Sequence, residues 1–144
     1  MNRVFIAMVL LSVATAAVSG QPVVLDDLKA RGAVQLSKQD LQQLLPGAKV
    51  VSHFEGSRRS WKNKADGTLL AISDVRRDPS KLGKQSTGQG SWHIDDNGRR
   101  CVTIEWPKRT ENWCKYLFKA DAQYYGVKSV TNGGAEAREF EISQ

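Results

Sequence analysis

The stretch of the chain from Gly90 to Phe118 contains three of the four tryptophans and both cysteines. Large apolar residues alternate there with polar ones, which is the pattern of half-buried β-strands. In the middle of the stretch, Val102, Ile104 and Trp106 would face one way and the residues between them the other. The connections are too short for a parallel crossover, so we predict three successive antiparallel strands.

Cys101 and Cys114 are the two cysteines of the chain, so an exported chain could form only one intramolecular disulfide. Two strand registers compete. If the cysteines face each other directly, Pro107–Lys108 must form a two-residue turn, which proline does not suit. A longer loop over Pro107–Asn112 would offset the cysteines by several residues, too far for a bridge. We predict the Cys101–Cys114 disulfide in either case, with a bulge or splayed strands to reconcile it with a long loop.

Residues 1–20 have the layout of a secretory signal peptide: one charged residue, Arg3, then an apolar run from Val4 to Leu11, then small residues. A membrane anchor is disfavoured because a spanning helix needs about 20 predominantly apolar residues. We expect cleavage near Gly20, no transmembrane segment in the mature chain, and a periplasmic or secreted protein. Removing Arg3 takes one charge from the formal net charge of +6 and leaves +5.

Two segments precede the strands. Residues 21–35 form an N-terminal arm that could make a short helical turn packed by its leucines or stay loose. The segment from Leu36 to Gly47 predicts one short α-helix, because Ser37 and Asp40 are spaced as a capping box and leucines follow at helical spacing. Its Pro-Gly end stops the helix.

From Lys49 onward the hydrophobic period changes to two, with a break at Gly56–Arg59 and a hairpin turn at Asp66–Gly67. About eight strands follow one another, joined mostly by short turns. We therefore predict a mainly β fold: an antiparallel meander of about eight strands that forms a barrel or half-barrel, with one short N-terminal α-helix. Residues 36–144 would form a single β-rich domain.

The segment from Asp74 to Gly88 contains four basic residues and no apolar period, which predicts a long loop of the kind that often carries function. Basic residues also surround Trp61, and the rings of Trp61 and Trp113 could contact an anionic partner beside these cations. The alternative is that both rings are core, as we expect for Trp92 and Trp106. The candidate residues for binding an anionic partner are Arg58, Arg59, Lys62, Arg76, Arg77, Lys81 and Lys84.

No catalytic or metal-ligating pattern stands out in the sequence. His53 and His93 have no second His or Cys at metal-ligand spacing. Asp95 and Asp96 precede Asn97–Gly98, where a turn needs a carboxylate that accepts backbone hydrogen bonds. A Gly-x-Ser-x-Gly nucleophile motif is absent. We expect a non-enzymatic protein without cofactor or metal.

Four motifs along the chain form a recognisable set: Leu-Leu-Pro-Gly at Leu44–Gly47, Asp-Gly-Thr-Leu at Asp66–Leu69, Gly-x-Trp-x-Ile-Asp-Asp-x-Gly-Arg-x-Cys at Gly90–Cys101, and Trp-Cys-Lys-Tyr at Trp113–Tyr116. The set resembles a family of small exported proteobacterial domains of unknown function. The resemblance spans roughly residues 36–130. It implies a compact periplasmic or secreted domain with a paired cysteine, and it brings no catalytic residues.

The basic residues and the lack of a catalytic pattern favour an exported binding or interaction module whose partner is an anionic glycan, a lipid or an acidic protein. Nucleic acid is not expected, since the chain is exported. The alternative is a small-ligand carrier with a lipocalin-like barrel cavity lined by Trp, Phe and Leu. A barrel with a completely filled interior would exclude that alternative.

Overall fold

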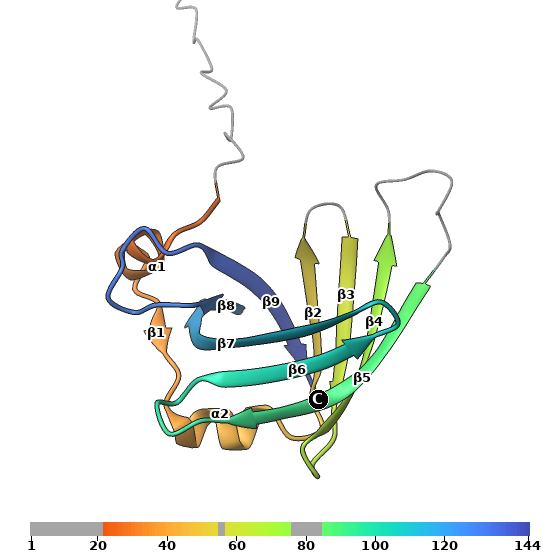
Figure 1. Ribbon diagram of the computed structural model, residues 1–144. Helices are drawn as coiled ribbons and strands as arrows, with labels where there is room; N and C mark the ends of the chain where they lie inside the picture. The colour runs from red at the N-terminus through yellow and green to blue at the C-terminus, as the bar shows by residue number, and fades with distance from the viewer. Residues whose placement is uncertain (1–21, 55–56, 76–84) are drawn as a thin grey trace, which may run out of the picture.

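The computed structural model describes residues 22–54, 57–75 and 85–144. The expected signal peptide at residues 1–20 lies outside these ranges. The described elements are α1 (Leu25–Ala30), β1 (Val34–Gln35), α2 (Lys38–Leu44), β2 (Lys49–Phe54), β3 (Ser57–Asn63), β4 (Thr68–Val75), β5 (Gln85–Ile94), β6 (Arg100–Trp106), β7 (Arg109–Ala120), β8 (Gln123–Val127) and β9 (Ala137–Ser143) (Figure 1).

Strands β2 to β9 form a closed antiparallel barrel (Figure 1). The hydrogen-bonded order is β7-β6-β5-β4-β3-β2-β9-β8, and the pairing of β7 with β8 closes the ring. The predicted mainly β fold with about eight antiparallel strands is therefore confirmed. Strand β1 is an addition to the barrel that pairs with the end of β7.

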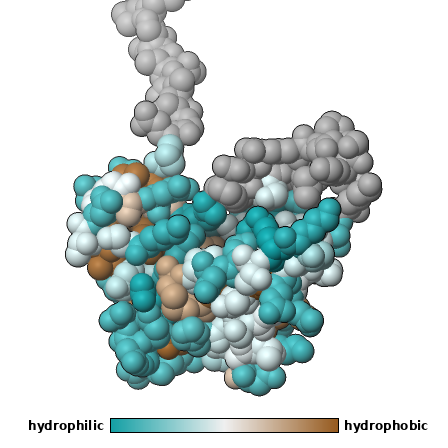
Figure 2. Space-filling view, viewed as in Figure 1, coloured by the Kyte–Doolittle hydropathy of each residue, from teal (hydrophilic) through white to brown (hydrophobic). Residues whose placement is uncertain are grey.

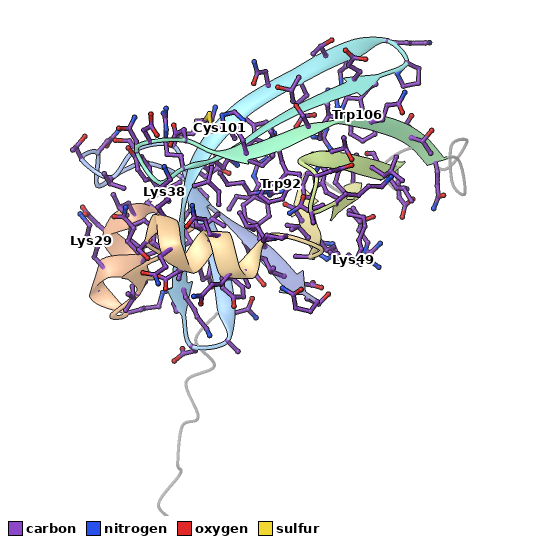
Figure 3. The ribbon with its side chains drawn as sticks, turned by 90° about the horizontal axis from the view of Figure 1, so that it is seen from below. Lys29, Lys38, Lys49, Trp92, Cys101 and Trp106 are labelled. Carbon is purple, nitrogen blue, oxygen red and sulfur yellow. A yellow bond between two sulfur atoms is a disulfide. The ribbon has the colours of Figure 1, made fainter. Side chains whose placement is uncertain are left out.

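The main core fills much of the barrel interior, and α2 lies across one end of the barrel (Figure 1). As predicted, α2 begins with a capping box in which Ser37 accepts a hydrogen bond from the Asp40 backbone and Asp40 accepts one from the Ser37 backbone. Trp92 lies next to α2 at this end, and its indole nitrogen donates to the Lys64 carbonyl at 2.9 Å (Figure 3). The buried core residues are Leu41, Leu45, Val50, Trp61, Leu69, Ala71, Trp92, Val102, Ile104, Trp106, Leu117 and Phe140.

A second, smaller core lies between α1 and the outer side of the sheet. Leu25 and Leu28 of α1 are fully buried with Phe118, Tyr125 and Val127. Of the two alternatives for residues 21–35, the helical turn packed by its leucines is the one observed. The face of the molecule in Figure 2 is mainly hydrophilic, as expected when two cores take up most of the apolar side chains.

Two of the predicted strand limits are wrong. A break is expected over Gly56–Arg59, but Ser57, Arg58 and Arg59 belong to β3. This strand starts at Ser57 and pairs with β2. The predicted Asp74–Gly88 loop is too long at both ends, since β4 runs to Val75 and β5 starts at Gln85. Small and polar residues made the start of β5 look like a loop. Glycine is needed in this part of β5, because a Cβ on Gly88 would lie 2.8 Å from Cγ2 of Ile104 and 3.1 Å from the Glu105 carbonyl oxygen of β6.

The two cysteines lie directly opposite each other in the β6–β7 pair and form the predicted disulfide. Their Cα atoms are 4.0 Å apart. The register continues to Trp106 opposite Arg109, so the connection is the two-residue turn Pro107–Lys108, and the longer loop is wrong. The disulfide indicates an oxidising compartment outside the cytoplasm. In the described part of the chain, neither helix has the length and apolar character needed to cross a membrane.

Opening the disulfide should lower the free energy of unfolding by about 3 kcal/mol, because the bridge closes a loop between residues 13 apart in sequence. The measurement is a urea unfolding curve of the oxidised protein and of the same protein after reduction and alkylation. Equal midpoints in the two curves would contradict this estimate.

Candidate functional site: a cationic pocket in the barrel

A pocket of about 200 Å³ lies inside the barrel between β2, β3, β7 and β9. Strand alternation turns most of its lining residues to the same side of the wall, while Asn112 has the opposite parity on β7 and Lys128 follows the end of β8. Four cationic side chains and one carboxylate line it together with three aromatic rings. The lining residues are Ser52, Arg59, Trp61, Glu111, Asn112, Trp113, Lys115, Lys128, Arg138 and Phe140.

The single carboxylate of this pocket, Glu111, is fully engaged by neighbours. Its two oxygens accept hydrogen bonds from Nη1 of Arg59 at 3.0 and 2.9 Å. They also accept from the indole nitrogens of Trp106 at 3.2 Å and Trp113 at 2.9 Å, and Arg109 lies 3.6 Å away. Glu111 therefore neutralises Arg59, and Arg138 pairs at 3.4 Å with Glu136, a residue that lines a neighbouring pocket.

Three aromatic rings form the apolar part of the site. The ring centroids of Trp61, Trp113 and Phe140 lie 6.1 to 6.3 Å from one another. The Arg100 guanidinium lies 5.6 Å from the Trp61 ring and 5.4 Å from the Trp113 ring. The Lys115 ammonium lies 5.1 Å from the Trp113 ring and 5.4 Å from the Phe140 ring. Cation–π contacts are thus the main compensation for two buried charges.

Arg100 is completely buried, with 0% of its surface exposed. Its Nη2 donates to the Asn63 side chain at 3.5 Å, while Nε and Nη1 have no hydrogen-bond partner among the described residues. Burial lowers the pKa of Arg100 to about 10, so the guanidinium remains charged at neutral pH. It therefore adds positive potential behind Trp61 and Trp113.

Lys115 stands opposite Arg100 in the β6–β7 pair and is 8% exposed. Across the described residues it makes no hydrogen bond and no ion pair. Burial, the largest cause, lowers the pKa of Lys115 to about 8, and the charges of Arg138, Lys128 and Arg100 act in the same direction. Glu136 acts in the opposite direction. Part of the Lys115 population is therefore a neutral amine near neutral pH.

Three further buried polar atoms on lining residues lack a partner among the described residues: Oγ of Ser52, Nε of Arg59 and Nε1 of Trp61. Buried polar groups are normally hydrogen bonded, and leaving one unsatisfied costs about 1–3 kcal/mol. All three can donate a hydrogen bond. A pocket with cations and unused donors is suited to an anion.

A second pocket of about 320 Å³ adjoins the first and shares Lys115, Lys128 and Arg138 with it. Its other lining residues are Ser129, Asn132, Ala135 and Glu136. Gly126 of β8 leaves room at this junction. A Cβ there would lie 3.0 Å from Cδ of Lys115 and 2.4 Å from the Phe140 ring.

The structure brings together three of the residues singled out from sequence. Arg59, Trp61 and Trp113 all line the pocket. Trp61 is 3% exposed and part of the core, so it is not a surface ring, and the expected core positions of Trp92 and Trp106 are confirmed.

The other predicted binding residues do not join this site. Arg58 and Lys62 alternate with Arg59 and Trp61 on β3 and so face outward, and the Lys62 ammonium donates to the Gly47 carbonyl. The remaining four candidates, in the segment 76–84, lie outside the described residues: Arg76, Arg77, Lys81 and Lys84.

Lys115, Lys128 and Arg138 were missed as site residues. The sequence does indicate that Lys115 shares a strand face with Trp113 and that Arg138 shares one with Phe140, because side chains alternate along a strand. It could not show that both faces point into the same barrel.

A metal centre finds no support in the described ranges, where the one group of potential ligands is Asp95, Cys101 and Cys114. Both cysteines are in the disulfide and offer no thiolate. Asp95 accepts hydrogen bonds from the backbone of Asn97 and Arg99, as expected for a turn residue.

The fold and the pocket define a small antiparallel β-barrel domain with a cationic internal site. Residues 9–116 match the model of a family described as "Protein of unknown function (DUF995)". This match covers most of the chain, so the protein belongs to that family, and the predicted membership of a family of unknown function is confirmed. Searches of curated proteins and of solved structures found no match.

The low pKa of Lys115 should make the free energy of unfolding rise with pH. The unfolded chain holds the lysine proton up to about pH 10.4, whereas the folded protein releases it from about pH 8. Between these values the unfolded state binds more protons, so the wild type should gain on the order of 1–3 kcal/mol relative to Lys115→Met. Urea unfolding of both proteins from pH 7 to 10 measures this difference. Parallel pH profiles would contradict it.

Proposed function

We propose that this protein is a non-enzymatic binding protein, periplasmic or secreted, that holds a small anion in the barrel pocket. The observation that supports this most strongly is the set of unpartnered donors on the pocket wall. Among the described residues, Ser52, Arg59 and Trp61 each place a buried donor there without an acceptor, and Lys115 adds a cation without an ion pair. An anion would satisfy both needs at once.

The charge balance of the lining residues supports an anion over a neutral ligand. The described lining of the pocket has four cationic side chains and one carboxylate, Glu111, which already binds Arg59. A neutral ligand would leave Lys115 without a counter-charge among the described residues, whereas Arg138 already pairs with Glu136 at 3.4 Å. Electrostatic attraction is stronger at a partly buried site than in bulk water, because the effective dielectric constant is lower there.

The size of the pocket favours a small ligand. At about 200 Å³ it lies below the usual range of about 300–1,000 Å³ for drug-sized molecules. A carboxylate or an inorganic oxyanion with a short apolar part against Trp113 and Phe140 would fill it. A long lipid tail would not, because the buried core occupies the rest of the barrel.

The outward-facing basic residues have a different role in this proposal. Arg58 and Lys62 lie on the outer side of β3, the same strand that turns Arg59 and Trp61 inward. They add to the positive field that attracts anions toward the protein. A large anionic partner such as a glycan would contact these residues and leave the pocket unused.

The proposal predicts saturable binding of one small anion per chain. The measurement titrates acetate, sulfate and inorganic phosphate separately into the protein at low ionic strength, followed by tryptophan fluorescence and calorimetry. We expect at least one of them to bind with one-to-one stoichiometry. Lys115→Met should weaken that binding about tenfold or more, because a charge-assisted contact contributes about 1.5–3 kcal/mol.

Lys62→Met is the matched control, since it removes a lysine from the outer side of the barrel wall. It should leave the affinity almost unchanged. Equal losses in the two variants would indicate general surface attraction in place of a pocket, and the absence of saturable binding by all three anions would refute the proposal.

A further inference from the structure

We propose that Lys115 is a carbonyl-reactive lysine that forms a Schiff base with a small oxo acid, a molecule with a carboxylate and a nearby aldehyde or ketone. This inference rests on the proposed function for holding the carboxylate and adds a covalent step to it. The class of ligand is thereby narrowed from any small anion to an oxo acid.

The position of Lys115 makes its amine available to a ligand. Lys115 lines both pockets and lies at their junction, together with Lys128 and Arg138. It is only 8% exposed, so a bound molecule would meet it away from bulk water. Within the described residues it forms no ion pair or hydrogen bond. Lysines held for structure are normally paired when they are this buried.

The surroundings of Lys115 favour the neutral amine, which is the nucleophilic form. Arg138 on β9, Lys128 after β8 and Arg100 on β6 all disfavour a further positive charge, while Glu136 partly opposes them. The neighbouring ring faces attract the Lys115 ammonium, but burial has the larger effect and lowers the pKa. With a pKa of about 8, roughly a tenth of Lys115 is neutral at pH 7, against well under a thousandth for an ordinary lysine. Desolvation and adjacent cations are a known way to activate a lysine.

The rest of the pocket suits the other end of such a ligand. The carboxylate of an oxo acid would lie among Arg138, Lys128 and the unpartnered donors of Ser52 and Trp61. Its carbonyl carbon, one or two bonds away, would then be close to the Lys115 nitrogen. The small volume of the pocket limits the ligand to a few heavy atoms.

The reaction is balanced without any further reactant. The amine nitrogen adds to the carbonyl carbon and gives a carbinolamine, and the carbonyl oxygen then leaves as water with the two amine protons. The product is an imine, and no electrons are transferred to or from another molecule. When protonated, the imine keeps the positive charge of Lys115 beside the bound carboxylate.

The test incubates the full protein with pyruvate or with glyoxylate, reduces any imine with cyanoborohydride, and maps the modified lysine by peptide mass spectrometry. We expect one adduct per chain, located at Lys115, formed faster as the pH rises toward 8. Lys115→Arg should lose the adduct while keeping the charge. Lys119→Met, which removes an exposed lysine from the same strand, should leave adduct formation unchanged.

The outcomes separate this inference from the proposed function. Comparable labelling of exposed lysines such as Lys128 and Lys119, or no stoichiometric adduct, overturns the Schiff base. If pyruvate still binds saturably by fluorescence in that case, the anion pocket stands and only the covalent step is wrong. If pyruvate neither binds nor reacts and the simple anions fail too, both proposals are wrong. Mapping on the wild type needs no variant, so a misfolded Lys115→Arg would not affect the result.

Discussion

Positive charge is buried inside the closed barrel, and the packing of β3, β6, β7 and β9 around the pocket depends on how this charge is compensated. Removing an ion from water costs several kcal/mol even after the protein relaxes. Arg59 is compensated by Glu111, whose two carboxylate oxygens both accept from its Nη1. Arg100 and Lys115 have no carboxylate partner in the described part of the chain. The rings of Trp61, Trp113 and Phe140 are arranged around these two cations.

The magnitudes indicate that the rings alone are insufficient. A desolvated cation–π contact contributes about 2 kcal/mol, which is smaller than the cost of burying a charge. Lys115 responds with a lowered pKa, which is the expected result of incomplete compensation. Buried cations without full compensation lower the stability of a small domain, and such groups are typical of a binding or reactive site. The same imbalance supports both the anion pocket and the reactive amine.

Much of the fold could be predicted from the sequence, because alternation of side chains and turn residues are local signals. The strand order, the Ser37 capping box and the Cys101–Cys114 bridge follow from such signals. The start of β5 could not be predicted, because its glycines serve a close approach to β6 that only the folded barrel creates. The two-residue turn at Pro107–Lys108 was disfavoured by proline, and the cross-strand pairing of the cysteines overrides that preference.

The site was less predictable than the fold, for a physical reason. At the end of β7 both faces are buried, since Leu117 points into the barrel and Phe118 packs under α1. Alternation therefore groups Trp113, Lys115 and Leu117 without showing which group faces the interior. A lysine in a strand is normally read as solvent-exposed. Only closure of the barrel places Lys115 beside Arg138 and Lys128.

The anion pocket can be tested directly by locating an anion in a crystal of this protein soaked in bromide. We predict an anomalous peak inside the barrel, within hydrogen-bonding distance of Nε1 of Trp61 and near Nζ of Lys115. Bromide bound only at exposed lysines and arginines, with the pocket occupied by neutral water alone, would contradict it.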